Sequence, residues 1–255
     1  MDNRMCLSTL LFSVFLVAGF AQKRLNNDTK GILYTKEKAF DLRLLTHGWS
    51  ADVYWGTLKT YYQTNYYRLS IGNLNHLKET RNTTDFQSLG LGFGQRNYRF
   101  GKQNYVCPLQ GGWGTKHYYT EKANKKGVSL AVNYSGGITA GLVIPYFLDI
   151  SNPKKKGVSN IIRYTKETAE LFLNQDLIRG KSSFFRGIKY MSVVPGVHVQ
   201  TGVHLDWGAF DEFLKAVEFG VQLQVFTKKM PLMINEESRP YFLNLYLSVQ
   251  VGKRS

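Results

Sequence analysis

The sequence predicts an all-β fold, an eight-stranded antiparallel transmembrane β-barrel with long extracellular loops, one of which contains a short helix. Two patterns lead to this prediction. Apolar and polar residues alternate with a period of two along several long segments, and the polar positions hold mostly small, uncharged side chains. The clearest case is 241–251, where every odd position is apolar or aromatic. This alternation is longer than the usual strand of about 5–6 residues and is typical of membrane-crossing strands.

The first half of the chain contains four segments with shorter alternation. In the first of them, Phe40, Leu42 and Leu44 alternate with Asp41 and Arg43. The four predicted strands contain residues 40–44, 53–55, 67–71 and 105–113. Pro108 is unfavourable in the last, because it lacks a backbone donor and a closed barrel has no edge strand to accommodate it.

The second half contains four cleaner segments, each about ten residues or more in length. They comprise residues 128–144, 197–207, 217–225 and 241–251. Eight is an even number of strands, so the first strand begins and the last strand ends on the same side of the barrel. Short turns on one side and long loops on the other are the expected asymmetry of an outer-membrane barrel. The predicted periplasmic turns lie near Gln63, Asn124 and Gly208, and the predicted extracellular segments lie near His47 and at 76–103, 148–190 and 228–239.

The polar residue types indicate which face of each strand meets water. A water-facing sheet surface normally carries long charged side chains. The polar faces of 128–144, 197–207 and 241–251 instead hold Ser, Asn, Gln, Gly, Thr and His, with no lysine. We therefore expect the polar rows to fill the interior and the apolar rows to meet lipid. A soluble lipocalin-like ligand-binding barrel, with an apolar interior, is the alternative.

The first residues indicate export. Arg4 precedes a short apolar run, and Gly19-Phe20-Ala21 forms a small-residue cleavage site, which is the pattern of a secretory signal peptide. The predicted domains are a signal peptide at 1–21 and an outer-membrane β-barrel at 22–255. After cleavage Cys107 would be the sole cysteine, which excludes an intramolecular disulfide.

Four short segments resemble those of known barrels. They are LTHGWS at 45–50, FGKQNY at 100–105, NYSGGITAGL at 133–142 and LYLSVQVGK at 245–253. On these segments the chain resembles an uncharacterised family of small outer-membrane β-barrel proteins of Gram-negative bacteria. The resemblance implies residence in the cell outer membrane and a barrel architecture, and it brings no established activity.

Charged residues on the inward rows are candidates for a polar network. An eight-stranded barrel is just wide enough to be filled by its own side chains, and a buried charge needs a partner. His198 and His204 share a face but lie about 20 Å apart along the strand, too far to bind one metal. The predicted network consists of Asp41, Arg43, Asp52, Arg68, His204, Asp206 and Glu218.

The segment 148–190 is rich in basic residues, and the chain as a whole carries a net charge of +15. Within it, TKETAELFLNQD predicts a short helix with Thr165 as its N-cap and Glu167 in its first turn. Lys and Arg form charge-assisted hydrogen bonds with phosphates, so this loop suits lipopolysaccharide, or a partner protein. The predicted contact residues are Lys154, Lys155, Lys156, Arg163, Arg179, Lys181, Arg186 and Lys189.

The function expected from these patterns is that of a structural or accessory barrel subunit. Its predicted partners are outer-membrane lipid, lipopolysaccharide and other outer-membrane or surface proteins, and not nucleic acid; no cofactor, metal or catalytic residue is predicted. The alternative is an enzyme that modifies lipid A at the rim, where the nearby polar residues match no hydrolase motif. Those rim residues are His47, Ser50, Asp52, His76 and Glu79.

Overall fold

The computed structural model of the chain describes residues 34–84, 96–120, 128–151, 159–165, 167–207, 212–234 and 236–255. The predicted signal peptide, the turns predicted near Asn124 and Gly208, and residues 154–156 lie outside these ranges.

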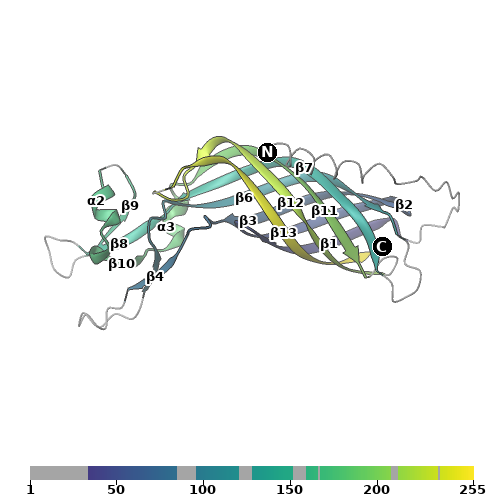
Figure 1. Cartoon of the computed structure of the whole chain (residues 1–255), viewed down its shortest axis with the longest axis horizontal. Helices are drawn as coiled ribbons and strands as arrows, with labels where there is room; N and C mark the ends of the chain where they lie inside the picture. The colour runs from purple at the N-terminus through teal and green to yellow at the C-terminus, as the bar shows by residue number, and fades with distance from the viewer. Residues whose placement is uncertain are drawn as a thin grey trace, which may run out of the picture. The chain divides into compact units, whose positions relative to one another are not determined.

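Eight long strands form a closed antiparallel barrel, as the sequence predicted (Figure 1). The order around the barrel is β1-β13-β12-β11-β7-β6-β3-β2, and β1 pairs with both β13 and β2, which closes the sheet. The strands are β1 (Lys36–Leu45), β2 (Gly48–Thr60), β3 (Gln63–Leu74), β6 (Asn104–Tyr118), β7 (Ser129–Pro145), β11 (Ser192–Asp206), β12 (Phe213–Met230) and β13 (Arg239–Arg254).

Burial alternates along each of these strands with the period seen in the sequence. In β13 the side chains of Leu243 and Leu245 are 59% and 66% exposed, whereas Asn244 and Ser248 are 0% and 1% exposed. Successive side chains of a strand point to opposite faces, so a single register places every apolar residue of this row outside. The small polar rows therefore face the interior, as predicted.

The two ends of the barrel differ in their connections. At the loop end, Thr46 and His47 join β1 to β2, and residues 231–238 join β12 to β13. At the opposite end, here the terminal end, Glu37 pairs with Arg254 as β1 begins and β13 ends. A two-residue turn at Tyr61–Tyr62 joins β2 to β3 there, directly before Gln63, which confirms the short turn predicted near this residue.

Gly48 allows the tight approach of β2 to β3 at the loop end. Its φ is +145°, and a Cβ at this position would lie 1.9 Å from the carbonyl oxygen of Asn73. We expect Gly48→Ala to lower the free energy of unfolding by about 1–3 kcal/mol, because it imposes backbone strain as well as a clash. Gly111→Ala is the control, since its added Cβ would meet no atom within 4 Å. Urea titration of both variants measures the difference, and equal losses would contradict this role of Gly48.

Pro108 lies in β6, which pairs with a neighbouring strand on each side and is therefore not an edge strand. Its Cα partner on β7 is Gly141. On the other side, the ladder between β3 and β6 passes from the pair Ile71–Leu109 to the pair Leu74–Val106 without pairing Pro108. The missing donor is thus accommodated by a local interruption of one ladder while the barrel stays closed.

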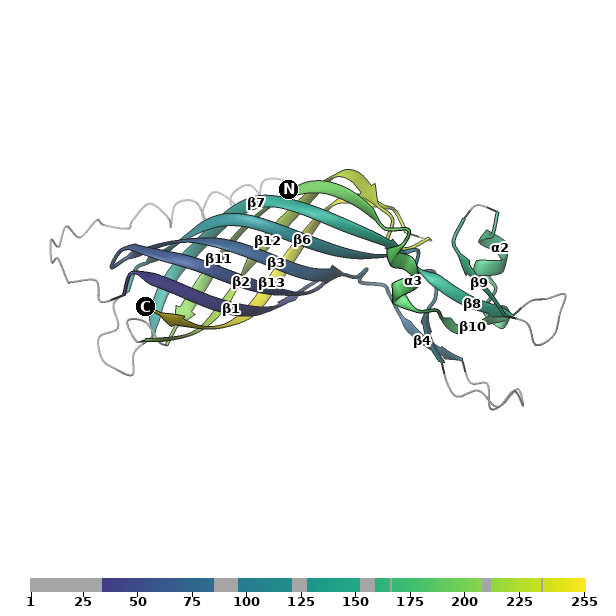
Figure 2. The ribbon, with the colours of Figure 1, turned by 180° about the vertical axis from the view of Figure 1, so that it is seen from behind.

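The segments outside the barrel fold into small sheets and helical turns rather than loops alone (Figure 2). Their shared core consists of Tyr98, Tyr146, Leu148, Ile150, Phe172 and Ile178. Within the predicted loop 148–190, Leu148 and Ile150 alternate with polar neighbours, which is the signal of a short strand. The elements are β4 (Arg81–Thr84), β5 (Arg96–Arg99), β8 (Phe147–Ser151), β9 (Ser159–Arg163), α2 (Ala169–Leu173), η2 (Gln175–Leu177), β10 (Ile178–Lys181) and α3 (Phe184–Ile188).

The short helix of this region begins later than the sequence indicated. Its N-cap is Thr168 rather than Thr165, and Glu170 rather than Glu167 lies in its first turn. The Thr168 hydroxyl donates to the carbonyl of Arg163 (2.8 Å) and also accepts from the backbone N–H of Thr165 (3.0 Å). These bonds hold the preceding residues in a turn. No helix among the described residues is long and apolar enough to cross a membrane.

Candidate functional site

The barrel interior is the first candidate site, because it holds all seven residues of the predicted polar network. Each of them is buried, and each has an ionic or hydrogen-bonded neighbour inside the barrel. They do not form one cluster. Six lie in a central network around Arg43, Arg68 and Glu218, whereas Asp206 belongs to a separate group at the terminal end.

Arg43 is the centre of the largest group. Its Nη2 atom donates to Asp41 (3.1 Å) and to the hydroxyl of Tyr54 (2.8 Å), and it lies 3.5 Å from Asp52. Its Nη1 atom donates to the side-chain oxygen of Gln200 (2.6 Å). The planar guanidinium can serve several acceptors at once, which is why one arginine can hold two carboxylates in a buried site.

Arg68 extends this group across the interior. Its guanidinium donates to the side-chain oxygens of Gln200 and Gln110, the latter at 2.8 Å. The carboxylate of Asp52 lies 3.7 Å from Arg68 and 3.5 Å from Arg43, so it sits between two cations. The carboxylate on β2 thus lies between cations on β1 and β3, and the attraction between these charges offsets the desolvation of each ion.

Glu218 is the second centre of the network. Both of its carboxylate oxygens accept from the amide of Asn133 (2.8 and 2.9 Å), and one accepts from the hydroxyl of Tyr246 (2.7 Å). The Nδ1 atom of His204 lies 3.1 Å from the same carboxylate, and Arg43 lies 3.8 Å away. These contacts join β12 to β7, β11, β13 and β1, so the group ties strands together across the barrel.

A third group at the terminal end was missed by the sequence reasoning. Arg254 donates to Glu37 (3.0 Å) and to Asp206 (2.7 Å), and Lys116 lies 3.2 Å from Glu37. Lys116 also donates to Gln250 (2.9 Å). The parity rule could have found them, because Glu37 shares the parity of Asp41, and Arg254 that of Gln250, on inward rows.

The interior as a whole is close to electrically balanced. Five buried carboxylates face four buried cations, with His198 and His204 beside them. The residues are Glu37, Asp41, Asp52, Asp206 and Glu218, against Arg43, Arg68, Lys116 and Arg254. This balance and the many cross-strand bonds favour a structural role for the network, because a buried charge without a partner would be costly.

An apolar cluster closes the interior at the loop end. Near this end the inward positions carry apolar residues, such as Phe226 and Phe242, instead of polar ones. The rings of these two residues meet edge to face, with their centres 6.0 Å apart. The cluster consists of Leu74, Val106, Val143, Val194, Phe226, Met230, Leu232 and Phe242.

An ion group lies beside this cluster. The buried Lys102 donates to Glu79 (2.8 Å), which also pairs with Arg99 (2.7 Å). Burial lowers the pKa of Lys102, and the carboxylate of Glu79 opposes that shift.

The rim residues that suggested an enzyme are not brought together. Ser50 and Asp52 are buried inside the barrel, and Glu79 is engaged by Lys102 and Arg99. His47 and His76 line one hollow of about 620 Å³ at the loop end. His47 Nδ1 lies 2.7 Å from Asn244 Oδ1, and His76 Nδ1 accepts from the backbone of Lys78.

The described residues lining this hollow include no serine, threonine or cysteine beside the two histidines. In the described ranges, no three His, Cys, Asp or Glu residues come together as a metal site.

The basic residues predicted to contact lipopolysaccharide are dispersed over the segments outside the barrel. Arg163 lies on β9 with its guanidinium 5.0 Å from the ring centre of Tyr190, and Arg179 on β10 donates weakly to Ser151 (3.4 Å). Arg186 lies in α3 and Lys189 directly follows it. Lys181 lines a pocket of about 260 Å³ together with Arg81 and Arg99.

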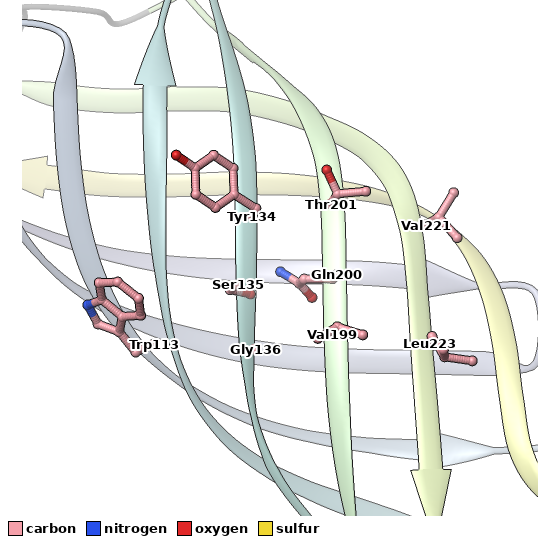
Figure 3. A pocket seen from close by; sticks show the side chains of 9 residues that line it. All are labelled: Trp113, Tyr134, Ser135, Gly136, Val199, Gln200, Thr201, Val221 and Leu223. Atoms are coloured by element: carbon pink, nitrogen blue, oxygen red, sulfur yellow. The ribbon is translucent and has the colours of Figure 1, made fainter. Parts of the chain in front are cut away.

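The outer wall of the barrel carries a shallow hollow of about 450 Å³ (Figure 3). It lies over β6, β7, β11 and β12, where Gly136 has no side chain between the rings of Trp113 and Tyr134. The remaining outer lining includes Val199, Thr201, Val221 and Leu223. The hollow is open and mostly apolar, so it offers a surface for a hydrocarbon chain rather than a site for chemistry.

The fold and the interior define the class: a closed eight-stranded up-and-down barrel with an apolar exterior and a filled, ionic interior. Comparison with models of known protein families gave no match, and neither did comparison with curated proteins.

Proposed function

We propose that the chain is an integral β-barrel of the bacterial outer membrane and serves there as a structural or accessory subunit. Its basic loop-end segments contact lipopolysaccharide or a protein complex that assembles or exports surface components. The exterior of the barrel supports residence in the membrane directly. The role as a subunit rests on the filled interior.

The distribution of apolar side chains over the barrel carries the proposal. Outward positions hold exposed aliphatic residues on every barrel strand, and the same strands bury polar and charged residues inside. Monomeric soluble proteins rarely expose a contiguous apolar patch larger than a few hundred Å². Hydrocarbon is the solvent that such an exterior suits. Examples of exposed outward residues are Leu42, Val53, Leu69, Leu109, Ile138, Val197, Val221 and Leu245.

The dimensions and the aromatic residues agree with a membrane span. The barrel strands run from 10 residues in β1 to 18 in β12. A tilted transmembrane strand needs about 9–11 residues. Outward aromatic residues are exposed toward the ends of several strands, as in the belts that lie at lipid headgroup level. Trp49, Phe213 and Tyr241 lie within the first residues of β2, β12 and β13, and Tyr119 and Trp207 directly follow β6 and β11.

The interior favours a subunit or scaffold over a wide pore or a ligand carrier. Charged and amide side chains bridge the barrel at its centre, and the apolar cluster closes its loop end. A lipocalin-like carrier would need an apolar interior cavity and a hydrated exterior, which is the reverse arrangement. The surface left for recognition is therefore the loop end, with its small sheets and basic residues.

Fractionation of cells that produce the full chain tests the membrane location. We expect the protein in the detergent-extracted outer-membrane fraction, since its exposed aliphatic rows would be unfavourable in water. The alternative considered from the sequence is a soluble barrel. Recovery of the protein in the periplasmic fraction would favour that alternative and overturn the proposal.

Affinity purification from native membranes, with mass spectrometry of the co-eluting proteins and lipids, tests the subunit role. Stoichiometric recovery of another outer-membrane or surface protein is the expected result. A barrel that elutes with lipid alone would contradict the subunit role and leave the membrane location intact.

A further inference from the structure

A small basic pocket lies outside the barrel, between the β4–β5 hairpin and β10. Its volume is about 260 Å³. Three cations line it, Arg81 from β4, Arg99 from β5 and Lys181 from β10, and none of the described residues that line it is a carboxylate. The remaining lining residues are Asn97, Tyr98, Tyr105 and Tyr146.

The two arginines face each other across the hairpin. Arg81 and Arg99 are directly opposite Cα partners in the antiparallel ladder. Opposite side chains in such a pair have Cβ atoms about 4.5–5.5 Å apart, and like charges there destabilise the sheet. The hairpin therefore has a built-in repulsion, which an anion bound between the two guanidinium groups would relieve.

The neighbouring acid does not neutralise this charge. Glu79 pairs with Arg99 (2.7 Å), but it also accepts from the buried Lys102 (2.8 and 3.0 Å). Among the described residues, Arg81 and Lys181 have no ion pair. One carboxylate thus serves two cations, so among the described residues the cations at the pocket outnumber the acid that pairs with them.

The aromatic residues give the pocket a fixed wall. The hydroxyl of Tyr146 accepts from the backbone N–H of Arg99 (3.1 Å), which anchors the hairpin against the residue that precedes β8. The rings of Tyr105 and Tyr146 meet edge to face at 5.3 Å. Burial raises the pKa of Tyr146, so its phenol remains neutral and adds no negative charge near an anion.

We propose that this pocket binds a phosphomonoester between Arg81, Arg99 and Lys181. Arginine forks match the geometry of phosphate oxygens, and lysine supplies a third, point-like charge. The phosphate can come from a lipopolysaccharide headgroup or from a soluble sugar phosphate. The inference rests on the proposed function only for the first of these sources, because the pocket itself does not depend on membrane residence.

Titration calorimetry on the full chain in detergent tests the pocket. The probes are glucosamine 1-phosphate, bisphosphorylated lipid A in mixed micelles, and the same lipid A after removal of its phosphates. We expect Arg81→Gln and Lys181→Gln each to weaken binding of a phosphorylated probe by about tenfold, because each removes a charge-assisted hydrogen bond. Binding of both phosphorylated probes indicates a site for sugar phosphates in general, and binding of lipid A alone identifies the headgroup as the source.

Lys59→Gln is the matched control. It removes the same charge from an exposed residue of β2 at the terminal end of the barrel, which does not line the pocket. We expect this variant to bind within about twofold of the unmodified protein. An equal loss in Lys59→Gln, or equal binding of the dephosphorylated lipid A, would show that general surface charge causes the effect and would overturn the pocket.

Thermal unfolding separates binding from folding. Without ligand, Arg81→Gln should unfold at or above the temperature of the unmodified protein, since it removes the repulsion with Arg99. Saturating phosphorylated probe should raise the unfolding temperature of the unmodified protein and raise that of Arg81→Gln much less. If neither phosphorylated probe binds, the pocket proposal fails while the membrane location stands; recovery of the chain in the periplasm would remove only the lipid source.

Discussion

Arg43→Met is expected to lower the free energy of unfolding by about 3–5 kcal/mol, the largest loss of any single substitution considered for this barrel. The guanidinium lies within 3.1–3.8 Å of Asp41, Asp52 and Glu218. Its removal leaves three buried carboxylates short of a cation, and methionine cannot replace the hydrogen bonds to Tyr54 and Gln200.

Urea unfolding in detergent, followed by tryptophan fluorescence, measures this loss. Lys189→Met is the control, because it removes a cation from an exposed position and should change the free energy by about 0.5 kcal/mol or less. The double variant Arg43→Met with Asp52→Asn should lose less than the sum of the two single variants, since each single variant already removes the interaction between these two residues. Additive losses would show that the two residues do not share one network.

Leu245→Arg is expected to cost about 2–4 kcal/mol of stability in a bilayer, because it places a charge near the middle of β13 on the outward face, which we propose to meet lipid. Val251→Arg lies on the same outward row, three residues before the end of β13, and should cost about 0–1 kcal/mol. Heat-modifiable gel mobility and urea titration in liposomes report both values.

This depth dependence discriminates between the two possible environments of the exterior. In water, both substitutions would replace an exposed aliphatic residue with a well-solvated one, and the cost would be small at either position. Equal and small effects of Leu245→Arg and Val251→Arg would therefore contradict the membrane location.

The sequence was sufficient to predict the barrel, because the face of a strand follows from parity alone. Asn244 and Ser248 are buried beside exposed Leu243 and Leu245, as the alternation of 241–251 predicted. Parity also placed Arg43 and Glu218 inside. Parity cannot say which inward residues meet, because contacts such as Asn133 with Glu218 depend on the stagger of strands that are not adjacent.

Other residues of the interior and of the basic pocket were missed for identifiable reasons. Glu37, Lys116 and Arg254 lie beyond the segments that the alternation marked, although each keeps the inward parity of its strand. The opposition of Arg81 and Arg99 follows from the register of the β4–β5 hairpin. The sequence reasoning treated 76–103 as one loop, and without a register it could not place two distant arginines face to face.

The pairing of β1 with β13 has a consequence for how the chain folds. The bond from Arg254 to Glu37 spans 217 positions, so it forms only after the final strand has been made and has reached the first. Contacts between such distant positions form slowly, and until then both margins of the growing sheet present unpaired backbone groups. Until β1 and β13 pair, these two margins are therefore the parts of the sheet most exposed to aggregation.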